Sequence, residues 1–286
     1  MSKRSLISEC RGQFHESLAG SILGLNENGN PSNADGESAL SVKIASGILD
    51  RLAATRNIGR LPPQRAGKHF EEACLSFLHK TYLKLTHIRP GAWAINRGTG
   101  KEFLISHFEQ YEHLSDLNAL LEQNPKLEAT LGPDYLIKPD IVVSRMPLSE
   151  ANINEHENLI DKTHSLRTPL RLSNNKKPFL HASISCKWTV RSDRAQNARS
   201  EALNLVRNRK GRLPHIVVVT AEPLPSRIAS LALGTGDIDC VYHFALTELI
   251  EAIESAGNGP ASAKLLTMID GRRLRDISDL PLDLAI

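Results

Sequence analysis

Several features are scarce in this sequence, and each absence excludes a class of protein. No apolar run approaches the ~20 residues of a membrane-spanning helix, and the basic first residues are not followed by the apolar core of a signal peptide. The four cysteines lack C-x-x-C spacing, which argues against a zinc site or a disulfide scaffold. We therefore expect a soluble, cytoplasmic protein that has no membrane partner.

A strong net charge is missing as well. The formal charge is +3 for 286 residues, which permits nucleic-acid binding without requiring it. The charge is unevenly spread, because residues 191–212 contain seven Arg and Lys against two acids. A solvated helix face explains such a run as readily as a nucleic-acid surface does. No repeat and no abrupt change in composition divides the chain, so a single domain over residues 1–286 is predicted.

Short apolar runs alternate with helical patterns along the chain. This alternation predicts an α/β fold with a mixed central β-sheet flanked by helices. Strands are expected at residues 135–143, 180–190, 215–221 and 240–244. Helices are expected at residues 38–56, 65–83, 108–121, 195–209 and 226–233, with a last helix capped by Thr247 and ending near Ala256. Residues 147–177 are polar and rich in breakers, which predicts an excursion between two strands.

The segment 180–190 concentrates polar and charged groups near the end of an apolar strand. Side chains alternate across a strand, so Ser185 and Lys187 share one face and Cys186 takes the other. A lysine in an apolar strand is costly unless an anionic group lies against it. Asp140, which follows Pro139 and opens the apolar run 141–143, is a candidate for that group.

This pattern resembles the PD-(D/E)XK nuclease superfamily, with one departure. Asp140 and Lys187 match the motif, but Ser185 stands where the family has its second acid. Glu201, fourteen residues beyond Lys187 and on the following helix, could supply the missing carboxylate. Together with the run Arg191-Ser192-Asp193-Arg194, this arrangement resembles the type IIF restriction endonucleases that read sites with a CCGG core. Without the resemblance, the spacing of Asp140, Ser185 and Lys187 is a loose pattern.

The resemblance implies Mg²⁺-dependent phosphodiester hydrolysis, with two ions per active site and a core at residues 61–250. Asp140 is the first choice for the bridging ligand, Glu201 and Glu71 are further carboxylates, and the backbone carbonyl of Cys186 is an extra ligand. Lys187 would stabilise negative charge at the attacked phosphate, although a lysine at a strand end can also extend to solvent.

Two of the catalytic candidates have simpler alternatives. Ser185 could do no more than form a hydrogen bond. Glu71 matches a helical glutamate that completes the metal site in the superfamily, but adjacent Glu71 and Glu72 also fit a solvated helix face. Glu72 is the alternative to Glu71.

Base-edge chemistry suggests how a CCGG core would be read. Arginine is bidentate to guanine, and a carboxylate accepts a hydrogen bond from cytosine N4. Arg191, Asp193 and Arg194 provide two guanine readers and one cytosine reader. Gln64 and Asp35 are loop candidates for the guanine amino group in the minor groove, and ordinary loop roles explain both equally well.

The resemblance implies a type II site-specific deoxyribonuclease. Its substrate would be double-stranded DNA with a CCGG-core palindrome such as GCCGGC, cut to leave four-base 5′ overhangs. A palindrome calls for two-fold symmetry, and the resemblance implies a dimer of dimers and a cognate methyltransferase. The alternatives are a structure-specific PD-(D/E)XK repair nuclease and a non-catalytic DNA-binding module. Residues 97–101 fail the phosphate-loop template and are predicted to form a turn.

Overall fold

The computed structural model describes residues 4–54, 62–98, 104–124, 126, 139–234 and 236–286. For residues 63, 117–119, 121, 122 and 192–194 within these ranges, it describes the backbone alone.

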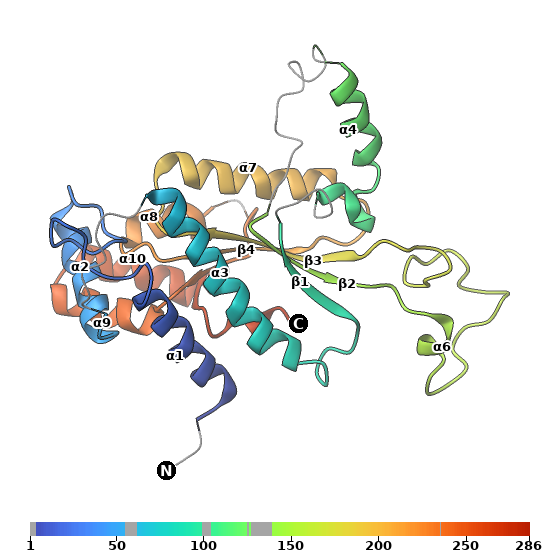
Figure 1. The fold of residues 1–286 in the computed structure, drawn as a ribbon, viewed down its shortest axis with the longest axis horizontal. Helices are drawn as coiled ribbons and strands as arrows, with labels where there is room; N and C mark the ends of the chain where they lie inside the picture. Colours follow the sequence, from blue (N-terminus) through green and yellow to red (C-terminus); the bar gives the residue numbers. More distant parts are fainter. Residues whose placement is uncertain (1–3, 55–61, 99–103, 125, 127–138, 235) are drawn as a thin grey trace.

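A six-stranded sheet forms the centre of the fold, as Figure 1 shows, and its spatial order follows the chain from β1 to β6. The strands are β1 (Trp93–Arg97), β2 (Ile141–Arg145), β3 (Phe179–Lys187), β4 (His215–Thr220), β5 (Cys240–His243) and β6 (Leu274–Asp276). Strand β2 pairs antiparallel with both β1 and β3. Strands β3 to β6 are parallel neighbours. The mixed α/β fold expected from the sequence is confirmed.

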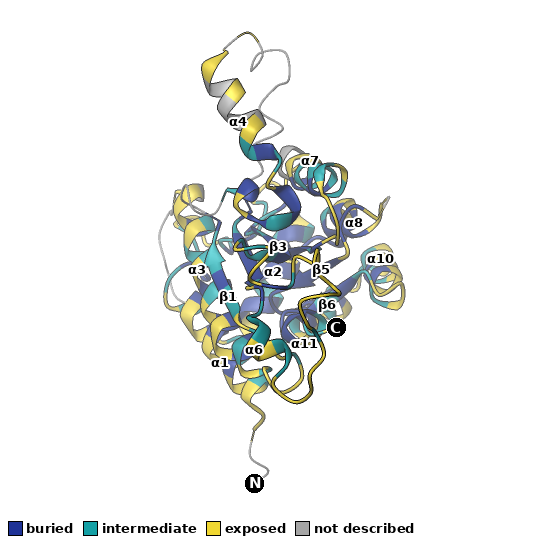
Figure 2. Ribbon diagram, turned by 90° about the vertical axis from the view of Figure 1, so that its right-hand side faces the viewer, coloured by how far each residue is buried: buried dark blue, intermediate teal, exposed yellow. Residues whose placement is uncertain are grey.

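Helices cover both faces of the sheet. They are α1 (Leu6–Ala19), α2 (Ala39–Arg51), α3 (Pro63–Thr81), α4 (Leu114–Gln123), α6 (Glu150–Ile153), α7 (Ser192–Asn208), α8 (Pro225–Ala232), α9 (Leu246–Ala256), α10 (Gly259–Asp270) and α11 (Leu280–Asp283), with 3₁₀ turns at Tyr82–Lys84, Ile105–His107 and Glu109–Tyr111. Figure 2 shows α7, α8 and α10 on one side of the sheet and α1 and α3 on the other. Parallel strands joined by right-handed crossovers place successive helices on one face, as α7 and α8 are here.

Apolar side chains at helical spacing hold α3 against the sheet. Phe70, Cys74, Phe77 and Leu78 are buried. Pro63 is the first residue of this helix, where its missing N–H costs nothing. Phe70 packs on Trp188 with ring centroids 5.3 Å apart. This contact fixes one turn of α3 beside the end of β3.

Several predicted boundaries were wrong for local reasons. The strand at 180–190 ends at Lys187, because the next residues bond to side chains beyond β4 rather than to a strand. The segment expected to be a helix at 108–121 is a 3₁₀ turn followed by α4. Strand β2 starts at Ile141, and residues 135–138 of the predicted strand lie outside the described part of the chain. Of the turn predicted at 97–101, the structure describes only Arg97 and Gly98.

The helix predicted to end near Ala256 is present and ends at that residue, but its predicted cap and its place as the last helix were wrong. Helix α9 begins at Leu246 after an N-cap at Ala245 that forms no side-chain cap bond, so Thr247 is not its cap. Gly257 ends α9 in the left-handed conformation, with φ of 67°. Asn258 then caps α10 by accepting a hydrogen bond from the Ala261 amide at 2.9 Å. Further secondary structure follows α10, and β6 completes the sheet.

The excursion at residues 147–177 is confirmed as a projecting arm, at the right of Figure 1. Its shape depends on Arg171, which is 3% exposed and bonds to the carbonyls of Asp161, His164 and Ser165 and to the Glu150 carboxylate. Among the described residues, no helix is long and apolar enough to span a membrane.

Candidate active site

Strands β2 and β3 separate at one end, and the candidate catalytic residues lie where they part. Their pairing stops at Ile141 and Ile184. Beyond this point β3 continues through Ser185 and Lys187, paired only with β4. The backbone amide of Cys186 therefore lacks a strand partner on the β2 side.

The Asp140 carboxylate occupies the opening between the strands. Its Oδ2 atom accepts a hydrogen bond from the Cys186 amide at 2.6 Å. The Ser185 hydroxyl and the Lys187 ammonium each lie 3.4 Å from the same oxygen. The structure thus brings together Asp140, Ser185 and Lys187 as the sequence predicted, and it gives the lysine its anionic partner.

A close backbone approach holds Asp140 in place. The Gly98 amide, just after β1, donates to the Asp140 carbonyl at 3.0 Å. A Cβ at residue 98 would lie 1.7 Å from the Pro139 carbonyl oxygen. Only glycine can occupy this position without displacing the chain that carries Asp140.

Two further carboxylates are partly buried near this pair. Burial raises the pKa of Glu201 on α7, nearby Lys187 opposes the rise, and the charge of Asp140 adds to it. Burial also raises the pKa of Glu71 on α3, and again the charge of Asp140 contributes. The charge of Asp140 therefore contributes to the raised pKa of both Glu201 and Glu71. Repulsion of this kind among carboxylates is relieved when a cation binds between them.

The structure separates Glu71 from its neighbour Glu72. The Glu71 side chain is 21% exposed, and one of its oxygens lies 3.7 Å from Arg97. The Glu72 side chain is 45% exposed and pairs with Arg97 at 3.2 Å and with His69 at 3.5 Å. Glu71 is thus the one shielded from solvent, whereas Glu72 forms surface ion pairs.

The donor set suits a hard divalent cation, although it is not a closed metal cage. Among the described residues, no three His, Cys, Asp or Glu side chains converge closely enough to form one. Asp140, Glu71 and Glu201 offer carboxylate oxygens only, which Mg²⁺ prefers while it keeps several waters. A hydrogen bond with Cys74 and burial both raise the pKa of the Cys186 thiol, which disfavours the thiolate form that binds metals. Only the backbone carbonyl of Cys186 remains available as a ligand.

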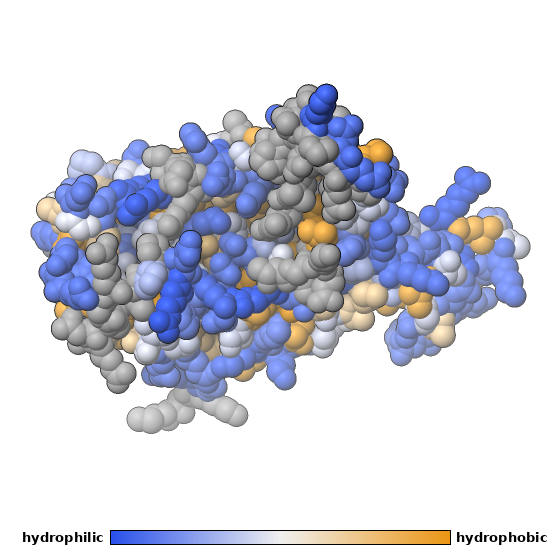
Figure 3. Space-filling model, turned by 45° about the horizontal axis from the view of Figure 1, so that its top comes forward, coloured by the Kyte–Doolittle hydropathy of each residue, from blue (hydrophilic) through white to orange (hydrophobic). Residues whose placement is uncertain are grey.

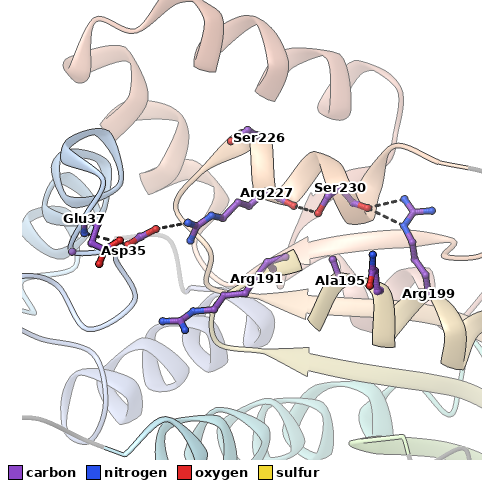
Figure 4. A pocket seen from close by; sticks show the side chains of 11 residues that line it. Asp35, Glu37, Arg191, Ala195, Arg199, Ser226, Arg227 and Ser230 are labelled. Carbon is purple, nitrogen blue, oxygen red and sulfur yellow. Dashed lines mark hydrogen bonds and ion pairs between the residues drawn. The ribbon is translucent and has the colours of Figure 1, made fainter. Parts of the chain in front are cut away.

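The predicted recognition residues begin four residues beyond the end of β3. Arg191 is exposed, and no described residue forms a hydrogen bond or ion pair with its guanidinium. It lines a cavity of about 840 Å³ together with Asp35 and Arg227. Figure 4 shows the Arg191 side chain extending toward the side on which Asp35 lies. Asp193 and Arg194 are in the first turn of α7, and their side chains lie outside those that the structure describes.

The two minor-groove candidates lie in different settings. Asp35 is in a loop, as expected, but it forms an ion pair with Arg227 on α8. This hydrogen-bonded pair lowers the pKa of Asp35. Gln64 was expected in a loop and is instead the exposed second residue of α3. The helix starts earlier than predicted because Pro63 is favourable at its first position.

Sequence reasoning missed two residues at this edge of the sheet. Arg227 binds Asp35 across 192 positions of the chain, a relationship that no local pattern could reveal. Glu222 follows β4, and its carboxylate accepts a hydrogen bond from the Val190 amide at 2.8 Å. A lone acid directly after the apolar run 215–221 was the available signal for Glu222, because parallel strands end at a common edge.

Comparison with known proteins identifies the class of enzyme. The type II restriction enzyme NgoMIV of Neisseria gonorrhoeae is 53% identical over 283 residues, covering 98% of this chain and 99% of that protein. This chain is accordingly a type II restriction endonuclease, a site-specific hydrolase of DNA. The family model described as NgoMIV restriction enzyme matches residues 14–286. The chain belongs to that family, and the resemblance to restriction endonucleases found in the sequence is confirmed.

A solved structure, the restriction endonuclease PspGI in complex with substrate DNA, also matches. It covers 98% of this chain and 90% of its own, with 16% sequence identity and a TM-score of 0.36.

Proposed function

We propose that this enzyme cuts double-stranded DNA at a palindrome with a CCGG core, GCCGGC in its full form, and leaves four-base 5′ overhangs. The observation that carries the proposal is that the catalytic and the DNA-recognition residues lie close together along the chain. Lys187 ends β3 beside Asp140, and the exposed Arg191, whose guanidinium pairs with no residue in the described part of the chain, follows four residues later. The residues form a single nuclease domain over 1–286 that acts in the cytoplasm.

The catalytic roles follow from the contacts at the parted strands. Asp140, Glu201 and Glu71 would hold two Mg²⁺ ions together with the Cys186 carbonyl. Bound Mg²⁺ supplies a water of lowered pKa and stabilises charge on the phosphoryl oxygens. Lys187, directed to this opening by Asp140, neutralises charge that develops on the attacked phosphate. Ser185 donates to Asp140 and keeps one carboxylate oxygen oriented.

The recognition roles rest on hydrogen-bonding capacity. Arg191 and Arg194 each offer the fork of donors that matches guanine O6 and N7, and Asp193 can accept from cytosine N4. Asp35 and Gln64 would contact the guanine amino group in the minor groove. The ion pair with Arg227 supports this assignment for Asp35, because it fixes the carboxylate at the rim of the cavity.

The projecting arm supports assembly into a dimer of dimers. Its Leu159, Leu166 and Leu172 are 65%, 49% and 41% exposed. Figure 3 shows apolar surface on this projection among polar residues. Clustered exposed apolar groups mark interaction surfaces, and the arm has an ordered polar interior around Arg171. A dimer would match the palindrome, and a second dimer would cover the arms. A methyltransferase that modifies the same site would protect the host DNA.

Digestion of defined DNA tests the proposal. A plasmid with one GCCGGC site and otherwise identical plasmids with single-base changes would be incubated with the enzyme and Mg²⁺, and the fragment ends sequenced. Cleavage confined to GCCGGC with four-base 5′ overhangs is the expected result. Cleavage at branches or without sequence preference would favour a repair nuclease. Site-specific binding without any product in several divalent metals would favour a binding module.

A further inference from the structure

Residues at the end of β4 form hydrogen bonds with the segment that joins the catalytic and recognition residues. This segment consists of Trp188, Thr189 and Val190, between Lys187 and Arg191. At its start, the Thr220 hydroxyl donates to the Lys187 carbonyl at 2.8 Å. The Ala221 amide lies 3.3 Å from the same oxygen. The backbone of Lys187 is therefore fixed from β4.

Glu222 fixes the other end of the segment. One oxygen of its carboxylate accepts from the Val190 amide at 2.8 Å, and the other accepts from the Leu224 amide at 3.2 Å. The Glu222 side chain is 1% exposed. An acid this deeply buried is tolerated when it receives such hydrogen bonds. The amide of Glu222 also donates to the Thr220 hydroxyl at 3.1 Å, so the two contacts form one unit.

The same unit reaches the loop that carries Asp35. An oxygen of Glu222 lies 3.9 Å from the guanidinium of Arg227, which is paired with Asp35. The Asn33 side chain donates to the Ala221 carbonyl at 2.8 Å. Residues 220–222, at the end of β4, therefore help to position two predicted DNA contacts, Arg191 and Asp35.

We propose that Thr220 and Glu222 are positioning residues that set the spacing between Lys187 and Arg191, so that correct base contacts are required for efficient cleavage. This inference rests on the proposed function, because it takes Arg191 as a base reader. A wrong base pair displaces Arg191, and the rigid segment passes that displacement to Lys187. Discrimination between sites then arises in the cleavage step as well as in binding.

Substitution of Glu222 by Gln tests the recognition end. Glutamine has one carbonyl oxygen, so it can accept from only one of the two amides and presents a donor to the other. We expect the ratio of single-turnover rate constants for GCCGGC over its single-base variants to fall by about tenfold, the scale of one lost hydrogen bond to a charged group. The dissociation constant for GCCGGC, measured in Ca²⁺, should change much less.

Thr220→Val tests the catalytic end and guards against a Glu222 variant that does not fold. Valine keeps the shape and removes the hydroxyl that holds Lys187. We expect a cleavage rate about tenfold slower with unchanged DNA affinity. Thr220→Ser restores the hydroxyl and should recover most of the rate. Gln110→Met is the matched control, because buried Gln110 bonds to the backbone of Leu180 at the opposite end of β3. It should lower the melting temperature without changing discrimination.

The outcomes separate this inference from the proposed function. Folded Glu222→Gln and Thr220→Val proteins that cleave and discriminate like the wild type would overturn the inference, with the proposed function intact. The inference would also be overturned if the Gln110→Met variant, at equal stability, lost as much cleavage rate and discrimination as the other two variants. Thr220 and Glu222 would then have a structural role only. A wild-type enzyme without sequence preference would overturn the proposed function, and the inference with it.

Discussion

The Lys187 ammonium lies 3.4 Å from the Oδ2 atom of Asp140, across the gap where β2 and β3 part. The lysine and aspartate side chains are 19% and 23% exposed. The pair is therefore shielded enough to interact strongly, yet open to a substrate. The Cys186 amide donates to the same oxygen at 2.6 Å, whereas Oδ1 has no hydrogen bond or ion pair with the described residues.

From this geometry, Asp140→Asn is expected to reduce cleavage by about 10³-fold or more while the fold is retained. Asparagine keeps the shape and can still accept a hydrogen bond from Cys186, but it removes the charge that would bind a metal. Single-turnover cleavage and a DNA gel-shift assay check this expectation. Asp50→Asn on α2, at an exposed position, is the control that should cleave normally. Substantial cleavage by Asp140→Asn would exclude Asp140 as an essential ligand.

Glu201→Gln is expected to lower the cleavage activity but raise the stability of the metal-free protein. Burial raises the pKa of Glu201 in the folded protein. The ionised carboxylate thus destabilises the metal-free fold at neutral pH, and the penalty disappears as the pH falls through the folded-state pKa. Glutamine should raise the melting temperature in EDTA at neutral pH, show no such gain in acid, and reduce cleavage about 10²-fold or more.

Mg²⁺ provides a second comparison for Glu201. The metal should raise the melting temperature of the wild type more than that of Glu201→Gln, because it binds the folded carboxylates. Equal stabilisation of both proteins, together with normal Mg²⁺-dependent cleavage by the variant, would mean that another acid completes the site.

The sequence predicted those parts of the candidate site that depend on the alternation or spacing of residues within one element. Alternation along β3 placed Ser185 and Lys187 on one face and Cys186 on the other, and the burial of Cys186 agrees. The order of Asp140, Lys187 and Glu201 suggested a nuclease only together with the run at residues 191–194. These residues are positioned by their own strands and helix, so periodicity and spacing describe them well.

Other parts of the site depend on contacts between distant segments. Glu71 and Glu72 are adjacent, and only the packing of Phe70 on Trp188 shows which glutamate turns inward. The Arg227–Asp35 pair and the Glu222–Val190 bond join loops that are far apart in sequence. Helix α10 was missed although Asn258 and Pro260 form a capping signature, because the helix ending near Ala256 was predicted to be the last one.

Gly98→Ala is expected to damage the site through the backbone. The added methyl group would overlap the Pro139 carbonyl, at 1.7 Å, and so displace Asp140. Overpacking of this kind costs about 1–3 kcal/mol, and cleavage should fall more than DNA binding does. Gly12→Ala is the matched control, because a Cβ at residue 12 meets no atom within 4 Å. A Gly98→Ala protein with normal cleavage would show that Asp140 tolerates the displacement.

Arg191→Lys is expected to relax sequence discrimination while preserving the charge. Lysine cannot form the two parallel hydrogen bonds that an arginine makes with guanine. Loss of this contact should cost about 1–3 kcal/mol of discrimination at one base pair, with little change in the salt dependence of binding. Competition binding to GCCGGC and its single-base variants measures both quantities.

The control for Arg191 lies on α7, the helix that follows it. Arg207 is exposed in the last turn of α7, so Arg207→Lys should leave discrimination unchanged. If Arg191→Lys and Arg191→Ala instead weaken binding to every sequence equally, and Arg191→Ala also reduces the salt slope by about one, then Arg191 contacts a phosphate. In that case Asp193 and Arg194 alone would remain as readers of the CCGG core, and discrimination at that core would have to be explained by the first turn of α7.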